Sequence, residues 1–299
     1  MPENKINWHK PVLLQQAINL LEVKKQQKYI DATLGNGGYS QEICRLGGNV
    51  LSIEADKRMI ELTKKRYKNC PSAFWKIVQG NFSRIKEIAK ENGFLPCKGI
   101  VFDLGISSLH YTSGRGFSFR DKDNLDMRLD EDNQTLTAHE IINTYPKDLL
   151  EEKLRYIAQE PMAFQIAEEI SKKRKNLKIN SAEELASIIK TVYESHNLKT
   201  KTHPATKTFM ALRIMVNREY ENLTKGLKQA FETLEIGGRL IVVSFHSGED
   251  RITKLYFRKL VKQKEAEDLT KKGIKASFKE IKENHLSRSA ILRGIEKIN

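Results

Sequence analysis

Residues that could do chemistry gather in the stretch IDATLGNGGYS, residues 30–40. Within it an acid, Asp31, precedes three glycines: Gly35, Gly37 and Gly38. Glycines let a backbone approach a ligand closely, and a helix that begins after such a turn offers unpaired N–H groups. Glu54 follows Gly35 by 19 positions, where an acid can accept hydrogen bonds from two ribose hydroxyls. The spacing predicts a site for a nucleoside-containing ligand.

The charge of Asp31 narrows the class of ligand. The pattern Gly35-x-Gly37-Gly38-x-Ser40 differs from the dinucleotide fingerprint G-x-G-x-x-G. An acid at the end of the first strand, followed closely by a glycine loop, suits a cationic ligand such as S-adenosylmethionine, which carries a sulfonium and an ammonium group. A nicotinamide- or flavin-dependent oxidoreductase stays open as an alternative, as does a glycine turn without a ligand.

A second acid, Asp103, lies in FDLGISS, residues 102–108, where a fourth strand is expected to end. Ligand and substrate meet at the carboxyl ends of parallel strands. Asp103 is therefore a candidate for orienting an amine or the amino acid part of the ligand, with a turn or helix-cap role as the alternative.

Short apolar runs predict the buried parallel strands that must position these acids. The runs cover residues 28–33, 49–55, 75–80, 99–105 and 238–245, and helical stretches separate the first four. This alternation of strand and helix is typical of a doubly wound α/β sheet.

The alternation stops after Asp103, and helical patterns follow at residues 148–158, 161–175, 181–196 and 206–234. We expect the last helix to end at Gly237-Gly238 and a further strand near residues 289–298. A helical subdomain at residues 109–202 is therefore expected inside a discontinuous domain of residues 1–108 and 203–299.

The chain has 52 basic and 38 acidic residues, a net charge of +14. Residues 251–299 contain 14 basic and 6 acidic side chains, so more than half of the excess lies in the last sixth of the chain. This concentration favours a polyanionic partner over a uniform lysine bias. Three cysteines, Cys44, Cys70 and Cys97, are too few and too scattered for a disulfide framework or a metal site, so we expect them to be packing residues and predict no metal ligands.

No apolar run approaches the roughly 18 residues that a membrane span needs, and the first ten residues lack the pattern of a signal or transit peptide. A cytoplasmic protein without a membrane partner is expected.

The chain resembles the ribosomal RNA small subunit methyltransferase H family, also called MraW, over nearly its whole length. The similar stretches are HKPVLL (9–14), IDATLGNGGYS (30–40), FDLGISS (102–108), RGFSFRDKDNLDMRLD (115–130), THPATKTFMALRIMVNREY (202–220), GGRLIVVSFHSGEDR (237–251) and NHLSRSAILR (284–293). The resemblance implies a class I, Rossmann-like S-adenosylmethionine-dependent methyltransferase sheet with a helical substrate-recognition subdomain inserted between strands four and five. It also implies methylation of the N4 amine of a P-site cytosine in 16S rRNA within the small ribosomal subunit; a homodimer stays open.

Carried over by position, the residues that the resemblance implies for the cofactor are Gly37, Gly38, Tyr39, Glu54, Phe82, Asp103 and His110. Asp31 and Gly35 join them from the residue argument above. The chain departs from the family's usual residues at Tyr39, Glu54 and His110, where His, Asp and Gln are more common.

A cytosine amine is a poor nucleophile because its lone pair is delocalised into the ring. Hydrogen-bond acceptors for its two N–H groups would favour localisation of the lone pair in the transition state. The candidates are Asp103 and the backbone carbonyls at Ser107 and Ser108, with His246 as a proton acceptor or a structural histidine. No covalent cysteine is needed.

The RNA contacts are expected from basic and aromatic side chains around the insertion. Candidate phosphate contacts are Arg115, Arg120, Arg128, Lys207 and Arg213, and candidate stacking platforms are Phe117, Phe119 and Phe245. A noncatalytic RNA-binding assembly factor with a relic cofactor site is the remaining alternative.

Overall fold

The computed structural model describes residues 10–67, 74–122 and 124–299, so His9 and Cys70 lie outside the described residues. The chain forms two compact units. The first combines the chain up to Ile106 with Tyr220–Asn299, and the second is Ser107–Glu219.

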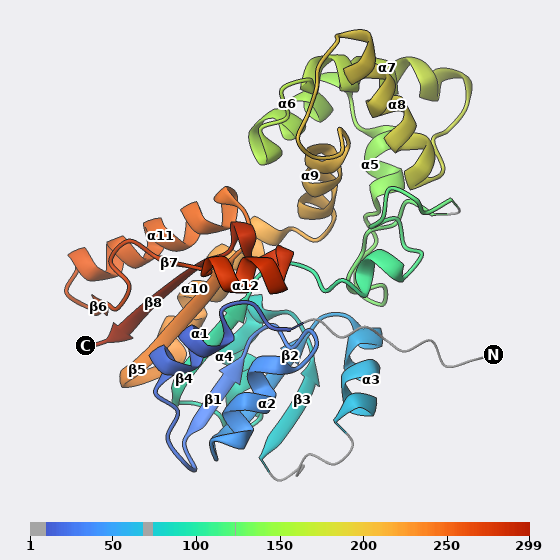
Figure 1. The fold of residues 1–299 in the computed structure, drawn as a ribbon. Helices are drawn as coiled ribbons and strands as arrows, with labels where there is room; N and C mark the ends of the chain where they lie inside the picture. The colour runs from blue at the N-terminus through green and yellow to red at the C-terminus, as the bar shows by residue number, and fades with distance from the viewer. Residues whose placement is uncertain (1–9, 68–73, 123) are drawn as a thin grey trace. The chain divides into compact units, whose positions relative to one another are not determined.

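The first unit is built on an eight-stranded sheet (Figure 1). Its strands are β1 (Lys28–Asp31), β2 (Asn49–Glu54), β3 (Trp75–Gln79), β4 (Cys97–Asp103), β5 (Leu234–Ser244), β6 (Ala266–Asp268), β7 (Ile274–Lys275) and β8 (Ile291–Lys297). The order is β3-β2-β1-β4-β5-β8-β6, with β7 paired to β8. Strands β1 to β5 are parallel, and β8 runs antiparallel to β5. The α/β sheet expected from the apolar runs is confirmed, as is the strand near the end of the chain.

Side chains of the sheet alternate between two apolar cores because successive residues of a strand point to opposite faces. Tyr29 and Val101 belong to one core and Ile30 and Phe102 to the other. Helices α1 (Leu14–Leu21), α2 (Gly38–Arg45) and α3 (Lys57–Arg66) contribute to the first core. Helices α4 (Ile85–Glu91), α10 (Glu219–Thr233) and α11 (Ser247–Lys262) contribute to the second. The sheet is thus covered on both faces, which is why its central strands read as continuous apolar runs.

The second unit is helical, as expected. After an irregular stretch it contains α5 (Ala138–Thr144), α6 (Lys147–Ala158), α7 (Ala163–Asn176), α8 (Ala182–Ser195) and α9 (Thr206–Val216). One buried carboxylate ties its parts together: Glu160 accepts hydrogen bonds from the hydroxyl of Tyr193 on α8, from Thr208 Oγ1 on α9 and from the backbone of Met162.

The boundaries of this unit differ from the expected range of residues 109–202, because α9 packs against α6. The continuous helix expected over residues 206–234 is wrong: α9 ends at Val216, and Arg218 has a left-handed φ of 49°. The cause is a tertiary anchor at Asn217, whose side chain accepts from the N–H of Leu129 and donates to the carbonyl of Met127.

The helix stop expected at Gly237-Gly238 is also wrong. Helix α10 ends at Thr233, and β5 begins at Leu234, which pairs with Cys97 of β4. The two glycines lie inside β5, at the place where its register with β4 shifts. Glycine within a strand often marks such an irregularity. A long-range strand pair thus decides this boundary.

The hydroxyl of Tyr193 should stabilise the helical unit, because Tyr193→Phe leaves the buried Glu160 with one donor fewer. We expect the free energy of unfolding to fall by about 1–3 kcal/mol, measured by urea unfolding with far-ultraviolet circular dichroism. Tyr156→Phe, at a side chain that is 72% exposed, is the matched control and should leave the midpoint unchanged. Equal midpoints for both variants would contradict the role assigned to Glu160.

Candidate active site

Three acids lie at the carboxyl edge of the sheet. Asp31 is the last residue of β1, Glu54 of β2 and Asp103 of β4. These strands are neighbours in the order β2-β1-β4, and because they are parallel their ends meet at one edge. The structure therefore brings together the acids that the spacing singled out.

The glycine loop is held against β2 and α3 by its own backbone. Gly35 donates its N–H to Glu54 Oε2 at 2.9 Å, and its carbonyl accepts from Thr63 Oγ1 at 2.9 Å. Gly37 has φ +75°, and a Cβ there would lie within 3.0 Å of side-chain atoms of Tyr67, Thr63 and Trp75. A side chain at Gly37 is excluded by both conformation and packing.

Asp31 is fully buried at the end of a chain of hydrogen bonds. Its Oδ2 accepts from Ser40 Oγ at 2.6 Å, and its Oδ1 accepts from Thr33 N at 3.2 Å. Ser40 Oγ lies 2.7 Å from Ser52 Oγ, which accepts from Trp75 Nε1 at 2.7 Å. Since Ser40 donates to the carboxylate, it must accept from Ser52, so the chain has one direction and delivers donors toward Asp31. Sequence reasoning missed Ser52 and Trp75, because only the pairing of β2 with β3 brings them beside α2.

The hydrogen bonds that Asp31 accepts do not fully offset the free-energy cost of burying its charged form. Burial raises the pKa of Asp31 from 3.8 to about 6, opposed by the hydrogen bonds from Ser40 and Thr33. A buried carboxylate whose ionised form is this costly is stabilised by an added positive charge. The site therefore favours a cationic ligand over a neutral one.

One carboxylate oxygen of Asp103 is buried without a hydrogen bond in the described structure. Its buried Oδ1 accepts no hydrogen bond from any residue that the structure describes. Burial, then the neighbouring charges of Asp31 and Glu249, raise its pKa well above the ordinary value. Its backbone N–H donates to Thr33 Oγ1 at 2.6 Å, which fixes the end of β4 against the loop after β1. An orphaned buried acceptor in an acidic setting fits an ammonium, a sulfonium or an amine.

Glu54 binds the glycine loop from the end of β2, and Phe82 follows the neighbouring strand β3. The second oxygen of Glu54 accepts from Asp56 N at 3.0 Å, so both carboxylate oxygens hold backbone N–H groups. Phe82 follows β3 and packs edge-on against Phe102, with ring centroids 5.4 Å apart.

Tyr39 has a structural side chain and a backbone in the position expected of a ligand contact. Its ring is 3% exposed, and its hydroxyl donates to the carbonyl of Val12. Its N–H belongs to the first turn of α2, where helical N–H groups have no partner within the helix. At Gly38, beside it, a Cβ would lie 2.0 Å from Pro11 Cγ. The segment before α1 therefore packs directly on the start of α2.

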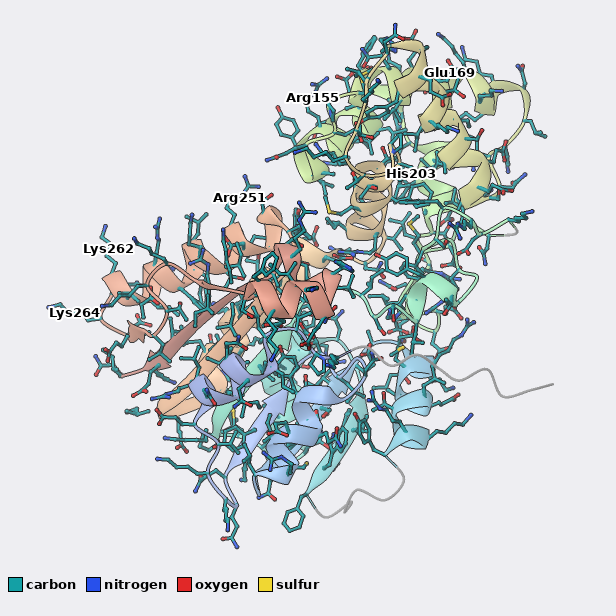
Figure 2. The ribbon with its side chains drawn as sticks, viewed as in Figure 1. Arg155, Glu169, His203, Arg251, Lys262 and Lys264 are labelled. Carbon is teal, nitrogen blue, oxygen red and sulfur yellow. The ribbon has the colours of Figure 1, made fainter. Side chains whose placement is uncertain are left out.

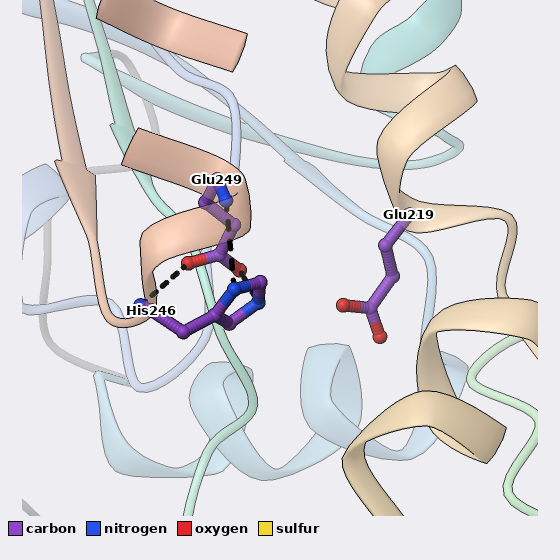
Figure 3. Close-up of side chains that lie close together, drawn as sticks. All are labelled: Glu219, His246 and Glu249. Atoms are coloured by element: carbon purple, nitrogen blue, oxygen red, sulfur yellow. Dashed lines mark hydrogen bonds and ion pairs between the residues drawn. The ribbon is translucent and has the colours of Figure 1, made fainter. Parts of the chain in front are cut away.

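His246 caps helix α11. Its Nδ1 accepts from Glu249 N at 3.5 Å, while the Glu249 carboxylate accepts from Phe245 N and His246 N (Figure 3). His246 Nε2 lies 3.1 Å from Glu249 Oε1. When Nδ1 accepts the capping hydrogen bond, the proton of a neutral imidazole is on Nε2. This arrangement favours a positioning role for His246 over a role as proton acceptor. Glu219, also drawn in Figure 3, belongs to the second unit and pairs there with Arg213.

Ser107, Ser108 and His110 open the second unit. The carbonyl of Ser107 accepts from His110 N at 2.9 Å, and the carbonyl of Ser108 accepts from Tyr111 N at 3.1 Å. The carbonyl of Ser107 also lies 3.1 Å from His110 Nδ1, whereas the carbonyl of Ser108 keeps one lone pair for a further donor. His110 is buried, with its ring centroid 5.4 Å from that of Phe117.

Most of the basic side chains that we expected to contact phosphates already pair with groups inside the second unit. Arg115 is 4% exposed and lies 3.5 Å from Glu131, while Arg128 forms a two-pronged pair with Asp126. Arg213 forms a similar pair with Glu219, and Lys207 donates to the carbonyl of Gln159. These side chains hold loops and helices together, and their sequence context gave no sign of it.

Two of the aromatic rings that we expected to stack on bases also pack against side chains of the second unit. Phe117 is buried and packs against His110 and Arg115. Phe119 stacks on the ring of His203, with centroids 4.5 Å apart and an interplanar angle of 19°. Phe119 also packs edge-on against Phe209, with centroids 4.8 Å apart, and it is half-buried whereas Phe117 is buried.

The two cysteines in the described part of the chain differ in burial. Cys97 is buried in β4, and burial raises the pKa of its thiol; Cys44 is half-buried on α2. Within the described ranges, no helix combines the length and the hydropathy that crossing a membrane requires.

A largely parallel sheet with a glycine loop after β1, an acid ending β2 and acids of raised pKa ending β1 and β4 defines a Rossmann-like, nucleoside-binding enzyme of the class I methyltransferase type. Comparison with known proteins identifies the family within this class. The model of the MraW methylase family matches residues 7–298, and the chain belongs to this family. It is thus an S-adenosylmethionine-dependent methyltransferase, and the oxidoreductase alternative falls away.

Relatives match over nearly their full length. The chain is 38% identical to the ribosomal RNA small subunit methyltransferase H of Persephonella marina, covering 97% of this chain and 99% of the relative. It is 40% identical to the protein of the same name from Oenococcus oeni, with 97% and 98% covered. The resemblance inferred from the motifs is confirmed.

The raised pKa of Asp31 makes the stability of the ligand-free protein depend on pH. Between pH 4 and 6 the folded protein keeps a proton that the unfolded chain releases. The free energy of unfolding should therefore fall as pH rises through this interval, by about 3 kcal/mol. Asp31→Asn should remove this part of the slope, measured by urea unfolding at several pH values.

The matched control is Asp148→Asn, at a carboxylate that is 93% exposed, and it should keep the slope of the unchanged protein. A wild-type slope in Asp31→Asn would show that Asp31 does not titrate in this interval.

Proposed function

We propose that this protein transfers a methyl group from S-adenosylmethionine to the N4 amine of a P-site cytosine in 16S rRNA. The substrate is the RNA within the small ribosomal subunit in the cytoplasm, and transfer is direct, without a covalent enzyme intermediate. The observation that carries the proposal is the buried, unpartnered Oδ1 of Asp103 beside the buried Asp31, next to the glycine loop. The names of the relatives, which specify small subunit rRNA, support the substrate.

The residues present fit the cofactor. When bound, S-adenosylmethionine supplies an electrophilic methyl group on a sulfonium cation. Asp31 and Asp103 would offset its positive charge, and the carboxylate of Glu54 would accept hydrogen bonds from ribose hydroxyls. The remaining contacts proposed are Gly35, Gly37, Gly38, the backbone of Tyr39, Phe82 and His110.

The chemistry on the amine depends on acceptors. Hydrogen bonds from the amine to Asp103, and to the carbonyl of Ser108, would favour a pyramidal nitrogen over a planar one. Interactions that strengthen only in the transition state raise the rate of the chemical step. The amine must also lose a proton, and a carboxylate whose pKa is raised is a better acceptor for that proton than an ordinary one. Asp103 therefore suits this task better than His246, which is engaged as a cap.

The helical second unit is proposed to recognise the RNA around the target base. A cytosine in a folded RNA must leave its stack to reach an amine-modifying site. The stacked pair of Phe119 and His203 offers an aromatic surface in this unit (Figure 2 labels His203).

The activity is tested with small subunits that lack the modification, purified protein and labelled S-adenosylmethionine. Nucleoside mass spectrometry should detect labelled, N4-methylated cytidine in the 16S rRNA. RNA that stays unlabelled would defeat the catalytic proposal, and so would tight binding of NAD without binding of S-adenosylmethionine.

Asp103→Asn tests the acceptor directly, because the amide keeps the shape of the side chain and loses its charge. We expect the single-turnover rate of transfer to fall about 100- to 1,000-fold, with small-subunit affinity unchanged. Asp268→Asn, at the far edge of the sheet on β6, is the matched control and should keep the full rate. Equal loss of transfer and of subunit binding in Asp103→Asn would show that Asp103 is structural.

A further inference from the structure

Helix α11 presents a positively charged face to solvent. Its basic residues are Arg251, Lys254, Arg258, Lys259 and Lys262, and its acids, Glu249 and Asp250, lie in the first turn. Glu249 is buried, and Asp250 is paired with Arg293 at 2.7 Å. Beyond the first turn the helix is therefore cationic throughout.

The helical period separates this charge from the apolar side. Arg251, Arg258 and Lys262 follow one another at intervals of seven and four residues, which places them on one stripe of an α-helix. Phe257 and Leu260, on the opposite side, are buried in the core that covers the sheet. Figure 2 shows Arg251 and Lys262 directed outward from the helix. We call Arg251, Arg258 and Lys262 the α11 stripe.

The stripe has no internal partner. Its three side chains are exposed, and none of them forms an ion pair with any residue in the part of the chain that is described. Helices of the second unit differ: Arg155 pairs with Glu151, Lys172 with Glu168 and Lys190 with Glu194. A general lysine bias gives mixed helices of that kind and does not explain a stripe without acids.

The stripe starts beside the candidate active site. His246, which caps α11, follows β5, and β5 pairs with β4 up to Asp103. Arg251 lies in the second turn of the helix. From Arg251 to Lys262 the stripe runs about 16 Å along the helix axis, at 1.5 Å per residue, so it leads outward from the carboxyl edge of the sheet.

We propose that the α11 stripe binds the phosphate backbone of the rRNA strand whose base enters the site. The inference rests on the proposed function and adds a binding surface to it. Guanidinium groups form two-pronged bonds with phosphates, and a cationic path that tracks the backbone is how single strands are held without sequence preference.

The test compares two triple variants with the same change in charge. The first is Arg251→Gln/Arg258→Gln/Lys262→Gln. The control is Lys24→Gln/Lys25→Gln/Lys28→Gln, three exposed lysines at the opposite, amino-terminal end of β1. Glutamine keeps helix propensity close to that of arginine and lysine. Binding to small subunits and to protein-free 16S rRNA is measured over a range of salt concentrations.

The stripe variant should bind both RNAs about 10- to 100-fold more weakly, with a salt slope smaller by about 2, since each contact with a single strand contributes about 0.7. The control should bind nearly as the unchanged protein does, and S-adenosylmethionine affinity should be the same in all three proteins.

Equal weakening in both variants would assign the effect to net charge and overturn the proposal, as would no weakening in either. Loss of subunit binding with unchanged affinity for protein-free rRNA would assign the stripe to a ribosomal protein instead. If the unchanged protein methylates no RNA, the proposed function fails, whereas the stripe is still judged from the binding curves.

Discussion

The burial of two carboxylates at one sheet edge is the constraint on which the site depends. Asp31 and Asp103 end neighbouring strands, and the charge of Asp31 adds to burial in raising the pKa of Asp103. Ionised groups are costly to bury unless they are paired or hydrogen-bonded. The protein supplies donors to Asp31 through Ser40 and Thr33 and leaves Asp103 Oδ1 without one in the described structure. The remaining cost makes the site selective for a partner that brings positive charge or N–H donors.

The loop geometry follows from the same requirement. The start of α2 must reach Asp31 so that Ser40 can donate to it, and this leaves no room for a Cβ at Gly37 or Gly38. Period and spacing in the sequence predicted the strands, the glycine loop and the three acids, because these are local patterns. They did not predict Ser52 or Trp75, whose contacts depend on strand pairing, nor the break at Asn217, which depends on a loop almost ninety residues earlier.

Charged residues show where sequence reasoning stops. Arg128 and Arg251 have similar local contexts of mixed charge, yet Arg128 is bound to Asp126 while Arg251 is exposed and forms no ion pair among the described residues. Residue type gives the capacity to bind a phosphate, and the fold decides whether that capacity is already used. The excess of basic residues after position 250 predicted a polyanionic partner, but only the packing of Phe257 and Leu260 shows which side of α11 is available.

The unit that carries the sheet therefore combines an acidic site with a basic helix face, and each suits a different part of the reaction. A negative site stabilises a cationic methyl donor but would repel a phosphate strand. The positive side chains of the α11 stripe can attract that strand from outside the acidic site, because Arg251, Arg258 and Lys262 are exposed. Separation along the helix thus lets one protein bind a cation and a polyanion at the same time, which methyl transfer to RNA requires.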